Sequence, residues 1–387
     1  MTARRLVLVA RRYWPLADDA SVVAMRLAAA FQSRGWPTTV LTCRWLRHWP
    51  DEFDHNGVRV VRLHRAPGGW FGGSGYRHRL RQWLAEHRQE YDAALVLGLL
   101  HDADTVVSSG DRWQFPVALR TLSAGPEGDC HRQLHEAGGG RKRRTCAHAT
   151  GIVGPTALAE RELIASGYPR DRIRLIPPGI ALPEERIGPV QRLAQQSLAS
   201  ANAELVVSER AWVALHVVRS HQLDATRWLL EIWRHVIERA PNSRLWLAGD
   251  MALQEKARSW AHELGVLGPA VNVGLFDDED DLYLAADALI EPGLSYESPL
   301  AVYRAMAAGL PVVAAVDGQH DSIIVDGRTG RRLPPRHLET LATAIEQLQS
   351  HTAWAAELGR AARAFIEQDY GIDAEVNAYA QLFDSTP

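Results

Sequence analysis

Short apolar runs alternate along the chain with longer segments in which apolar residues recur every three or four positions. Residues 6–10 and 38–42 have the length and the apolar content of buried strands. Between them, residues 21–34 place four apolar side chains on one side of a predicted helix, which Gly35 ends. These side chains belong to Val22, Met25, Leu27 and Phe31. Because strands that alternate with helices pair in parallel, the pattern predicts an α/β fold with parallel sheets.

The second half of the chain repeats this alternation, and its most informative part begins with an apolar strand at residues 288–290. Ser298 then stands where a helix N-cap is expected, and Pro299 takes the first helical position. The helix should end at Gly309, and residues 312–315 should form the next buried strand. A loop that leads from a strand into a helix exposes free N–H groups and the positive end of the helix dipole. The sequence therefore predicts an anion site at the carboxyl ends of parallel strands.

Composition narrows the class of protein without changing this picture. A chain of 387 residues suggests two or three domains, and a net charge of −3 argues against a dedicated nucleic-acid binder. Cys43, Cys130 and Cys146 lack the spacing of metal ligands, and the histidines are scattered, so we expect no metal site and a reducing compartment. No apolar run reaches the ~18 residues of a membrane span, and the first residues lack the pattern of a signal peptide. We therefore expect a cytoplasmic protein.

Several segments resemble a known family, in the same order along the chain. Residues 305–313 read Ala-Met-Ala-Ala-Gly-Leu-Pro-Val-Val, and residues 326–330 read Asp-Gly-Arg-Thr-Gly. Residues 13–15 read Tyr-Trp-Pro, and residues 173–180 read Ile-Arg-Leu-Ile-Pro-Pro-Gly-Ile. Together they resemble the nucleotide-sugar signature and the first-domain segments of the retaining glycosyltransferases of family 4.

This resemblance implies the GT-B architecture, in which two Rossmann-like, doubly wound α/β domains face each other across a cleft. Residues 1–183 would form the N-terminal, acceptor-side domain, and residues 184–208 the interdomain linker. Residues 209–370 would form the nucleotide-sugar domain. Residues 371–387 would form a C-terminal helix that crosses back to the first domain.

The resemblance also implies the residues of the site. In the family an Arg and a Lys hold the donor diphosphate and neutralise the leaving group, because fixed cations stabilise charge where it develops. Arg219 matches that Arg, and Arg304 or Arg120 would supply the second positive charge. Arg219, Glu297 and Arg304 are therefore the expected catalytic residues. Further donor contacts are expected from Ser298, Pro299, Leu300 and Gly125. No metal or other cofactor is implied beside the donor substrate, a nucleotide-diphosphate sugar.

Three positions of the donor-site signature in the second half of the chain depart from the family pattern. Asp224 stands where the family has the Lys, Arg304 where it has a second Glu, and Ser322 where a Glu precedes the Asp-Gly pair. Because Arg has no hydrogen-bond acceptor, Arg304 cannot accept bonds from ribose hydroxyls as that Glu does.

The function implied is a retaining glycosyltransferase that moves a sugar from the donor to a glycan, lipid-linked or small-molecule acceptor. One alternative is a catalytically degenerate GT-B protein that binds a nucleotide sugar, glycan or partner without turnover. Another is a nucleotide-sugar epimerase on the same fold. Such an epimerase needs carboxylate acid–base groups, of which we see no clear pair.

Residues 76–88 form a predicted basic amphipathic helix with Arg77, Arg79 and Arg81 on it. Such a helix can lie on an anionic membrane surface, which would give the protein a peripheral contact at the inner membrane face. The alternative, which we prefer, is a solvated helix packed by its apolar side.

Overall fold

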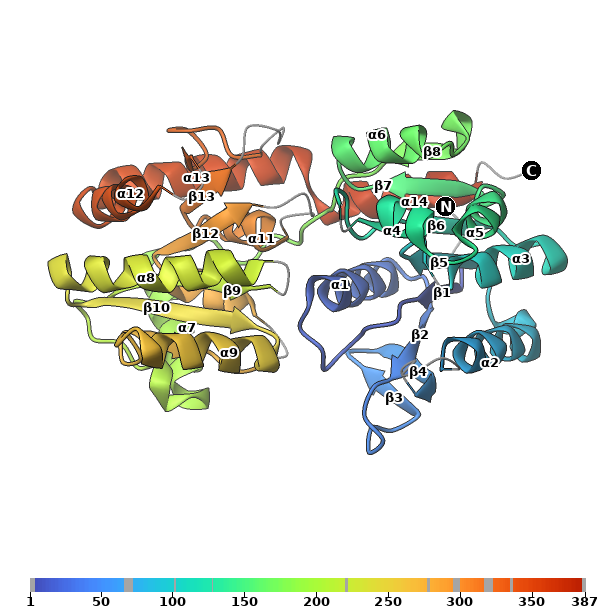
Figure 1. Cartoon of the computed structure of the whole chain (residues 1–387), viewed down its shortest axis with the longest axis horizontal. Coiled ribbons are helices and arrows are strands. Elements are labelled where there is room, and N and C mark those ends of the chain that lie inside the picture. The colour runs from blue at the N-terminus through green and yellow to red at the C-terminus, as the bar shows by residue number, and fades with distance from the viewer. Residues whose placement is uncertain are drawn as a thin grey trace. The chain divides into compact units, whose positions relative to one another are not determined.

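The computed structural model describes residues 4–65, 72–100, 102–126, 128–219, 222–276, 279–294, 300–316, 323–334 and 337–384. The chain forms two compact units, each an α/β structure built on one sheet (Figure 1). Residues 4–179 and 372–384 build the first unit, and residues 180–294 and 300–371 build the second. The alternation of strands and helices confirms the α/β class that the hydrophobic pattern predicts.

In the part of the chain that the structure describes, the sheet of the first unit has the strand order β3-β4-β2-β1-β5-β6-β7-β8. All neighbouring strands pair in parallel except β3 and β4. The strands are β1 (Leu6–Val9), β2 (Thr38–Arg44), β3 (Glu52–His55), β4 (Val58–Arg65), β5 (Ala93–Leu97), β6 (Val117–Arg120), β7 (Gly151–Gly154) and β8 (Ile173–Leu175). The strand order reverses between β1 and β5, which makes that position the switch point of this sheet.

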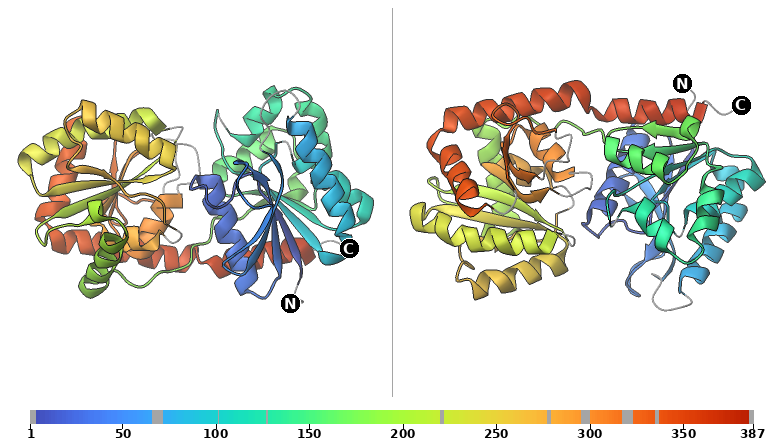
Figure 2. Two further views of the ribbon diagram at one scale, coloured as in Figure 1. Left: turned by 90° about the horizontal axis from the view of Figure 1, so that it is seen from below. Right: turned by 45° about the horizontal axis from the view of Figure 1, so that its top comes forward.

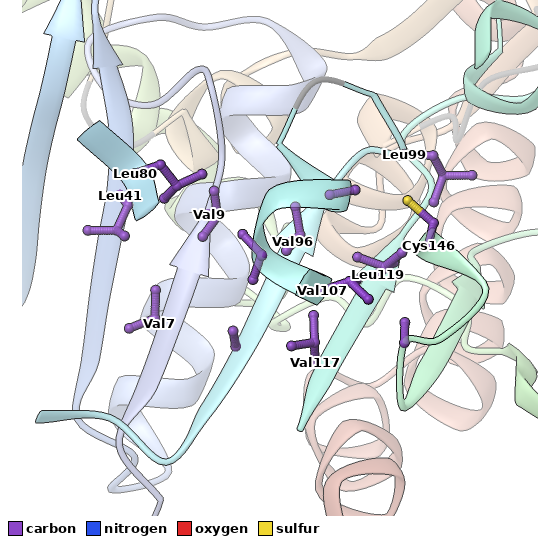
Figure 3. Packing of buried hydrophobic residues seen from close by; sticks show 14 of the residues in the cluster. Val7, Val9, Leu41, Leu80, Val96, Leu99, Val107, Val117, Leu119 and Cys146 are labelled. Atoms are coloured by element: carbon purple, nitrogen blue, oxygen red, sulfur yellow. The ribbon is translucent and has the colours of Figure 1, made fainter. Parts of the chain in front are cut away.

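Helices cover both faces of this sheet (Figure 2). They are α1 (Asp19–Ser33), α2 (Gly72–Glu86), α3 (Ala103–Trp113), α4 (Asp129–His135), α5 (Gly139–Cys146), α6 (Ala157–Ala165) and α14 (Ile372–Asp384). The first of them begins at Asp18, whose carboxylate accepts a hydrogen bond from the Ser21 amide as an N-cap does. On one face, alternate residues of the strands, such as Val7 and Val9, pack against Leu80 of α2 and Val107 of α3 (Figure 3).

The C-terminal helix α14 belongs to the first unit, where it packs on α1. The Tyr379 ring lies edge-on to Phe31, with ring centroids 5.8 Å apart, and Phe383 lies 6.3 Å from Trp36. Both Tyr379 and Phe383 are buried. The last described residues of the chain therefore contribute to the same core as its first helix.

The sheet of the second unit has the order β11-β10-β9-β12-β13-β14 across the described residues, and all its pairs are parallel. Its strands are β9 (Trp212–Val218), β10 (Ser243–Gly249), β11 (Ala270–Asn272), β12 (Ala288–Leu294), β13 (Val312–Val316) and β14 (Arg331–Leu333). In chain order this is the 3-2-1-4-5-6 arrangement of a doubly wound dinucleotide-binding fold. Its switch point lies between β9 and β12.

The helices of the second unit also lie on both faces of its sheet. They are α7 (Gly188–Ala201), α8 (Leu223–Arg239), α9 (Met251–Glu263), α10 (Asp280–Ala285), α11 (Leu300–Ala308), α12 (Leu338–Ser350) and α13 (Thr352–Asp369). Ala214 and Val218 of β9 and Ile290 of β12 pack on one face against Trp233 of α8, which is fully buried. The residues that alternate with these along the same strands point to the opposite face of the sheet.

Two segments differ from their expected form. Residues 184–208, expected as a linker, contain α7, whose Gln191 and Gln195 donate hydrogen bonds to the carbonyl of Ala285 in the second unit. The strand expected at residues 288–290 extends as β12 to Leu294, with an irregular register between Glu291 and Leu294. The helix α11 does end at Gly309, whose positive φ of 75° suits a glycine at that position.

Candidate functional site

The switch point of the second unit brings together residues that are far apart in the sequence. Arg219 directly follows β9, and Glu291 lies in the neighbouring strand β12. Doubly wound sheets bind ligands in the crevice outside the carboxyl ends of the strands at this point. The topology therefore places Arg219 at the carboxyl edge of this sheet, beside the strand β12.

Arg219 is held by two side chains at this edge. Its Nη1 donates to Oε2 of Glu291 at 2.6 Å and to Oε1 of Gln222 at 3.2 Å. The side chains of Arg219 and Glu291 are 7% and 1% exposed. Gln222 also donates through Nε2 to the carbonyl of Gly293 at 2.5 Å. This network ties the end of β9 and the start of α8 to the end of β12.

Close backbone contacts fix the same edge. A Cβ added to Gly293 would lie 3.1 Å from the Cβ of Ala225 in the first turn of α8. A Cβ added to Gly249, at the end of β10, would lie 2.5 Å from the carbonyl oxygen of Val218, and its φ is 116°. Glycine at position 249 is thus required both by its backbone angle and by the closeness of β9.

A buried histidine, His216, links β9 to β12 and to α8 near this edge. His216 Nδ1 lies 3.0 Å from the carbonyl oxygen of Ile290, and Nε2 lies 2.9 Å from Oγ1 of Thr226. Because a carbonyl only accepts, Nδ1 carries the proton and Nε2 accepts from the Thr226 hydroxyl. Burial lowers the pKa of His216 to about 3, so the ring stays neutral at physiological pH.

Arg304 of α11 is held by a separate group of side chains. It pairs with the carboxylates of Glu279 and Asp280, and its guanidinium lies 4.7 Å from the ring centroid of Tyr283. Burial alone would lower the pKa of Arg304, but the phenol of Tyr283 and the two carboxylates raise it overall. Burial also raises the pKa of Tyr283. Arg304 is thus a fixed cation with its counter-charges in place, and its side chain is 15% exposed.

Several predicted site residues lie outside the described residues: Glu297, Ser298, Pro299 and Ser322. Leu300 is the first residue of α11, and its side chain is buried. Asp224, in the first turn of α8, is exposed. The structure therefore brings Arg219 to the start of α8 and the end of β12, and it places Arg304 on the helix that follows β12.

Arg120 and Gly125 belong to the first unit. Arg120, the last residue of β6, is 1% exposed, and its Nη1 lies 3.8 Å from Oε1 of Glu375 in α14. The amide of Gly125 donates to Oε1 of Glu162 at 2.7 Å, and its φ of 86° suits glycine. Both predicted ligand contacts thus have protein partners within their own unit.

The switch point of the first unit also holds a buried ion pair. Arg11, two residues after β1, donates through Nη2 to Oδ1 of Asp102 at 2.9 Å, and Asp102 lies just before α3. Burial raises the pKa of Asp102, although Arg11 opposes this shift.

Among the described residues, no group of three or more His, Cys, Asp or Glu side chains is arranged to hold a metal ion. In the same part of the chain, no helix has both the length and the apolar character needed to cross a bilayer. Arg79 and Arg81 are exposed on α2, whereas Leu80, Trp83 and Leu84 are buried. The amphipathic form of this helix is as expected, and its membrane contact stays a prediction.

The sequence analysis did not identify Glu291, Gln222 or the partners of Arg304. One signal was present: Glu291 follows three apolar residues of a buried strand, and a charged group in that position requires a partner. Glu279 and Asp280 were visible as acidic residues beside a helix start, but nothing local in the sequence pairs them with Arg304, which lies 25 and 24 positions away.

Two family models match the chain. "Glycosyl transferase 4-like domain" matches residues 20–179, and "Glycosyl transferases group 1" matches residues 212–351. Among curated proteins, the putative glycosyltransferase EpsF of Bacillus subtilis (strain 168) is 29% identical over 245 residues. That alignment covers 62% of this chain and 60% of EpsF, so the chain spans less than two thirds of this relative's length.

Solved structures resemble the whole chain. Sucrose-phosphate synthase of Thermosynechococcus elongatus has a TM-score of 0.73 and 19% identity, with 98% of both chains covered. HepE of Anabaena in complex with UDP and glucose has a TM-score of 0.74 and 16% identity, with 99% of this chain and 100% of HepE covered. At such identities the likeness shows the fold.

Proposed function

Because the chain belongs to the glycosyltransferases of family 4, whose GT-B fold it has, we propose that it transfers a sugar from a nucleoside-diphosphate sugar to an acceptor. The acceptor class is a glycan, a lipid-linked molecule or a small molecule. The observation that carries the proposal is the position of Arg219 at the switch point of the second unit.

In this proposal the donor diphosphate binds at the carboxyl edge formed by β9 and β12. Arg219 contacts the diphosphate, and Glu297, Ser298 and Pro299, together with Leu300 at the start of α11, bind the rest of the donor. The sugar is transferred to the acceptor with retention of its anomeric configuration, and the nucleoside diphosphate leaves. The negative charge that develops on the leaving diphosphate is stabilised by fixed cations at this edge.

Arg304 is the better candidate for the second positive charge. It lies in the second unit, on the helix α11 that follows β12. Arg120 lies in the first unit and is buried against Glu375. We therefore assign Arg120 a lesser part, and assign Arg304 a long-range electrostatic contribution rather than a direct contact.

The first test is calorimetric titration with UDP, GDP and ADP and with their common sugar conjugates. UDP is the first ligand to test, because HepE was solved with UDP and glucose. We expect micromolar binding of one nucleotide, and we expect Arg219→Ala to weaken it by roughly 1.5–3 kcal/mol, as for a charged hydrogen bond. An unchanged affinity in that variant would show that the site lies elsewhere.

An assay of sugar transfer and donor hydrolysis with the nucleotide so identified then tests the reaction. Release of nucleotide together with a glycosylated acceptor supports the transferase. Binding without release would instead favour a protein that holds a nucleotide sugar without turnover. Conversion of the donor to its epimer would favour an epimerase.

A further inference from the structure

We propose that Glu291 sets how tightly this site binds a diphosphate, because it holds Arg219 in place and neutralises its charge until a phosphate competes for the guanidinium. The inference rests on the proposed function, since it concerns the same donor site. It adds a residue that the sequence analysis did not assign.

The geometry makes Glu291 a direct partner of Arg219. The two side chains meet at 2.6 Å across the switch point, one from the end of β9 and one from β12. Both are buried, so solvent screens their interaction little. Gln222 contacts the same Nη1 from α8's N-cap position and holds the carbonyl of Gly293. The guanidinium is thereby fixed in orientation as well as neutralised.

The charges of the described side chains that pair with Arg219 and Arg304 also indicate that Glu291 limits diphosphate binding. Arg219 pairs with the carboxylate of Glu291, and Arg304 pairs with those of Glu279 and Asp280. These five side chains together carry a net charge of −1. A diphosphate brought to Arg219 is therefore attracted by the guanidinium and repelled by Glu291 in a poorly screened place. The affinity of the site should be limited by this carboxylate.

Glutamine at position 291 separates this role from a purely structural one. Its side chain has nearly the shape of glutamate, and its carbonyl still accepts a hydrogen bond from Arg219, but the negative charge is removed. If Glu291 serves only packing and orientation, Glu291→Gln should not raise the affinity for the diphosphate. If its negative charge weakens diphosphate binding, Glu291→Gln should raise that affinity.

The test compares the Kd of UDP for the full chain and for Glu291→Gln by calorimetry at several NaCl concentrations. We expect binding about tenfold tighter in the variant at low salt, equal to ~1.4 kcal/mol, and a gain that shrinks as salt rises. The matched control is Asp287→Asn, which makes the same charge change just before the other end of β12. Asp287 pairs with Arg186, so this control should leave the Kd unchanged.

Because loss of the carboxylate leaves Arg219 buried without it, Glu291→Gln is also checked for folding by circular dichroism. If Glu291→Gln unfolds, a second pair of variants tests the proposal. Arg219→Gln/Glu291→Gln has no buried charge at this pair, and it should bind UDP several-fold more tightly than Arg219→Gln alone.

An equal or weaker Kd in Glu291→Gln, or equal Kd values for the double variant and Arg219→Gln, would overturn the proposal. A gain of the same size in Asp287→Asn would overturn it as well, since net charge alone would then explain the effect. Failure of the proposed function looks different. In that case the unmodified chain binds none of the nucleotides, or Arg219→Ala binds as well as the unmodified chain.

Discussion

Replacement of Glu375 by Gln should destabilise the first unit strongly. Glu375 lies in the first turn of α14 with a fully buried side chain, and it pairs with Arg26 of α1. It also accepts a hydrogen bond from the amide of Gly179 at 2.7 Å and lies 3.8 Å from Nη1 of Arg120. The neutral side chain of glutamine would leave the buried guanidinium groups of Arg26 and Arg120 without the negative charge of Glu375.

The magnitude follows from the burial of the three groups. The side chains of Arg26, Arg120 and Glu375 are 13%, 1% and 0% exposed, so water compensates little for the lost charge. Removing one partner of such a buried pair costs about 3 kcal/mol or more. For a unit of this size, about 3 kcal/mol lowers the midpoint of thermal unfolding by roughly 6–12 °C.

Differential scanning calorimetry measures this shift, and hydrogen exchange of the α14 amides assigns it to the first unit. The matched control is Asp384→Asn, the same chemical change at the other end of α14. Asp384 is 53% exposed and pairs with Arg4, so its loss should cost no more than about 1 kcal/mol. If Glu375→Gln shifts the midpoint no further than Asp384→Asn does, the reasoning about buried charge is refuted.

Three further predictions concern the second unit. The pKa of His216 is about 3 in the fold and 6.5 in the unfolded chain, so the unfolded state binds more protons as pH falls below 6.5. The free energy of unfolding measured with urea should therefore be highest above pH 6.5 and fall by up to roughly 4–5 kcal/mol toward pH 3. His216→Gln should make this free energy depend less on pH. Asp224→Lys should tighten UDP binding about two- to tenfold if position 224 faces the phosphates, and an unchanged Kd in calorimetry would show that it does not. Gly249→Ala should destabilise the unit by ~1 kcal/mol or more, because φ is 116° and the new Cβ would collide with the Val218 carbonyl; thermal unfolding as stable as that of the unmodified chain would contradict this.

The regular elements were predictable because their cause is local. Apolar residues at a spacing of three or four specify α1, and the apolar runs of β1 and β13 specify buried strands whatever they pack against. Arg219 was identified in a different way, from the resemblance to the family, in which an Arg at this position holds the donor diphosphate. Its placement at the switch point then follows from the order of the strands.

The partners of the charged residues were not predictable in this way. Glu291 meets Arg219 across 72 positions of sequence, and Glu375 meets Arg26 across 349. No periodicity records such contacts, because they depend on which strands become neighbours and how far each side chain reaches. Arg304 shows the limit most clearly: the resemblance suggested that it supplies a second positive charge at the diphosphate, and nothing in the sequence indicated its pairing with Glu279 and Asp280.

At the switch point of each sheet, an Arg is paired with a buried carboxylate. In each unit, an Arg follows the strand that comes first in the sequence, Arg11 after β1 and Arg219 after β9. Each Arg pairs with a carboxylate from the neighbouring strand across the switch point or from the loop after that strand. The switch point offers free carboxyl strand ends and little solvent, so a lone guanidinium there would be a buried charge without compensation. The carboxylates Asp102 and Glu291 remove that cost in the unliganded chain. In the second unit, under the proposed function, the donor diphosphate gains from Arg219 only what remains after Glu291 is displaced or repelled, so its affinity depends on both members of the pair.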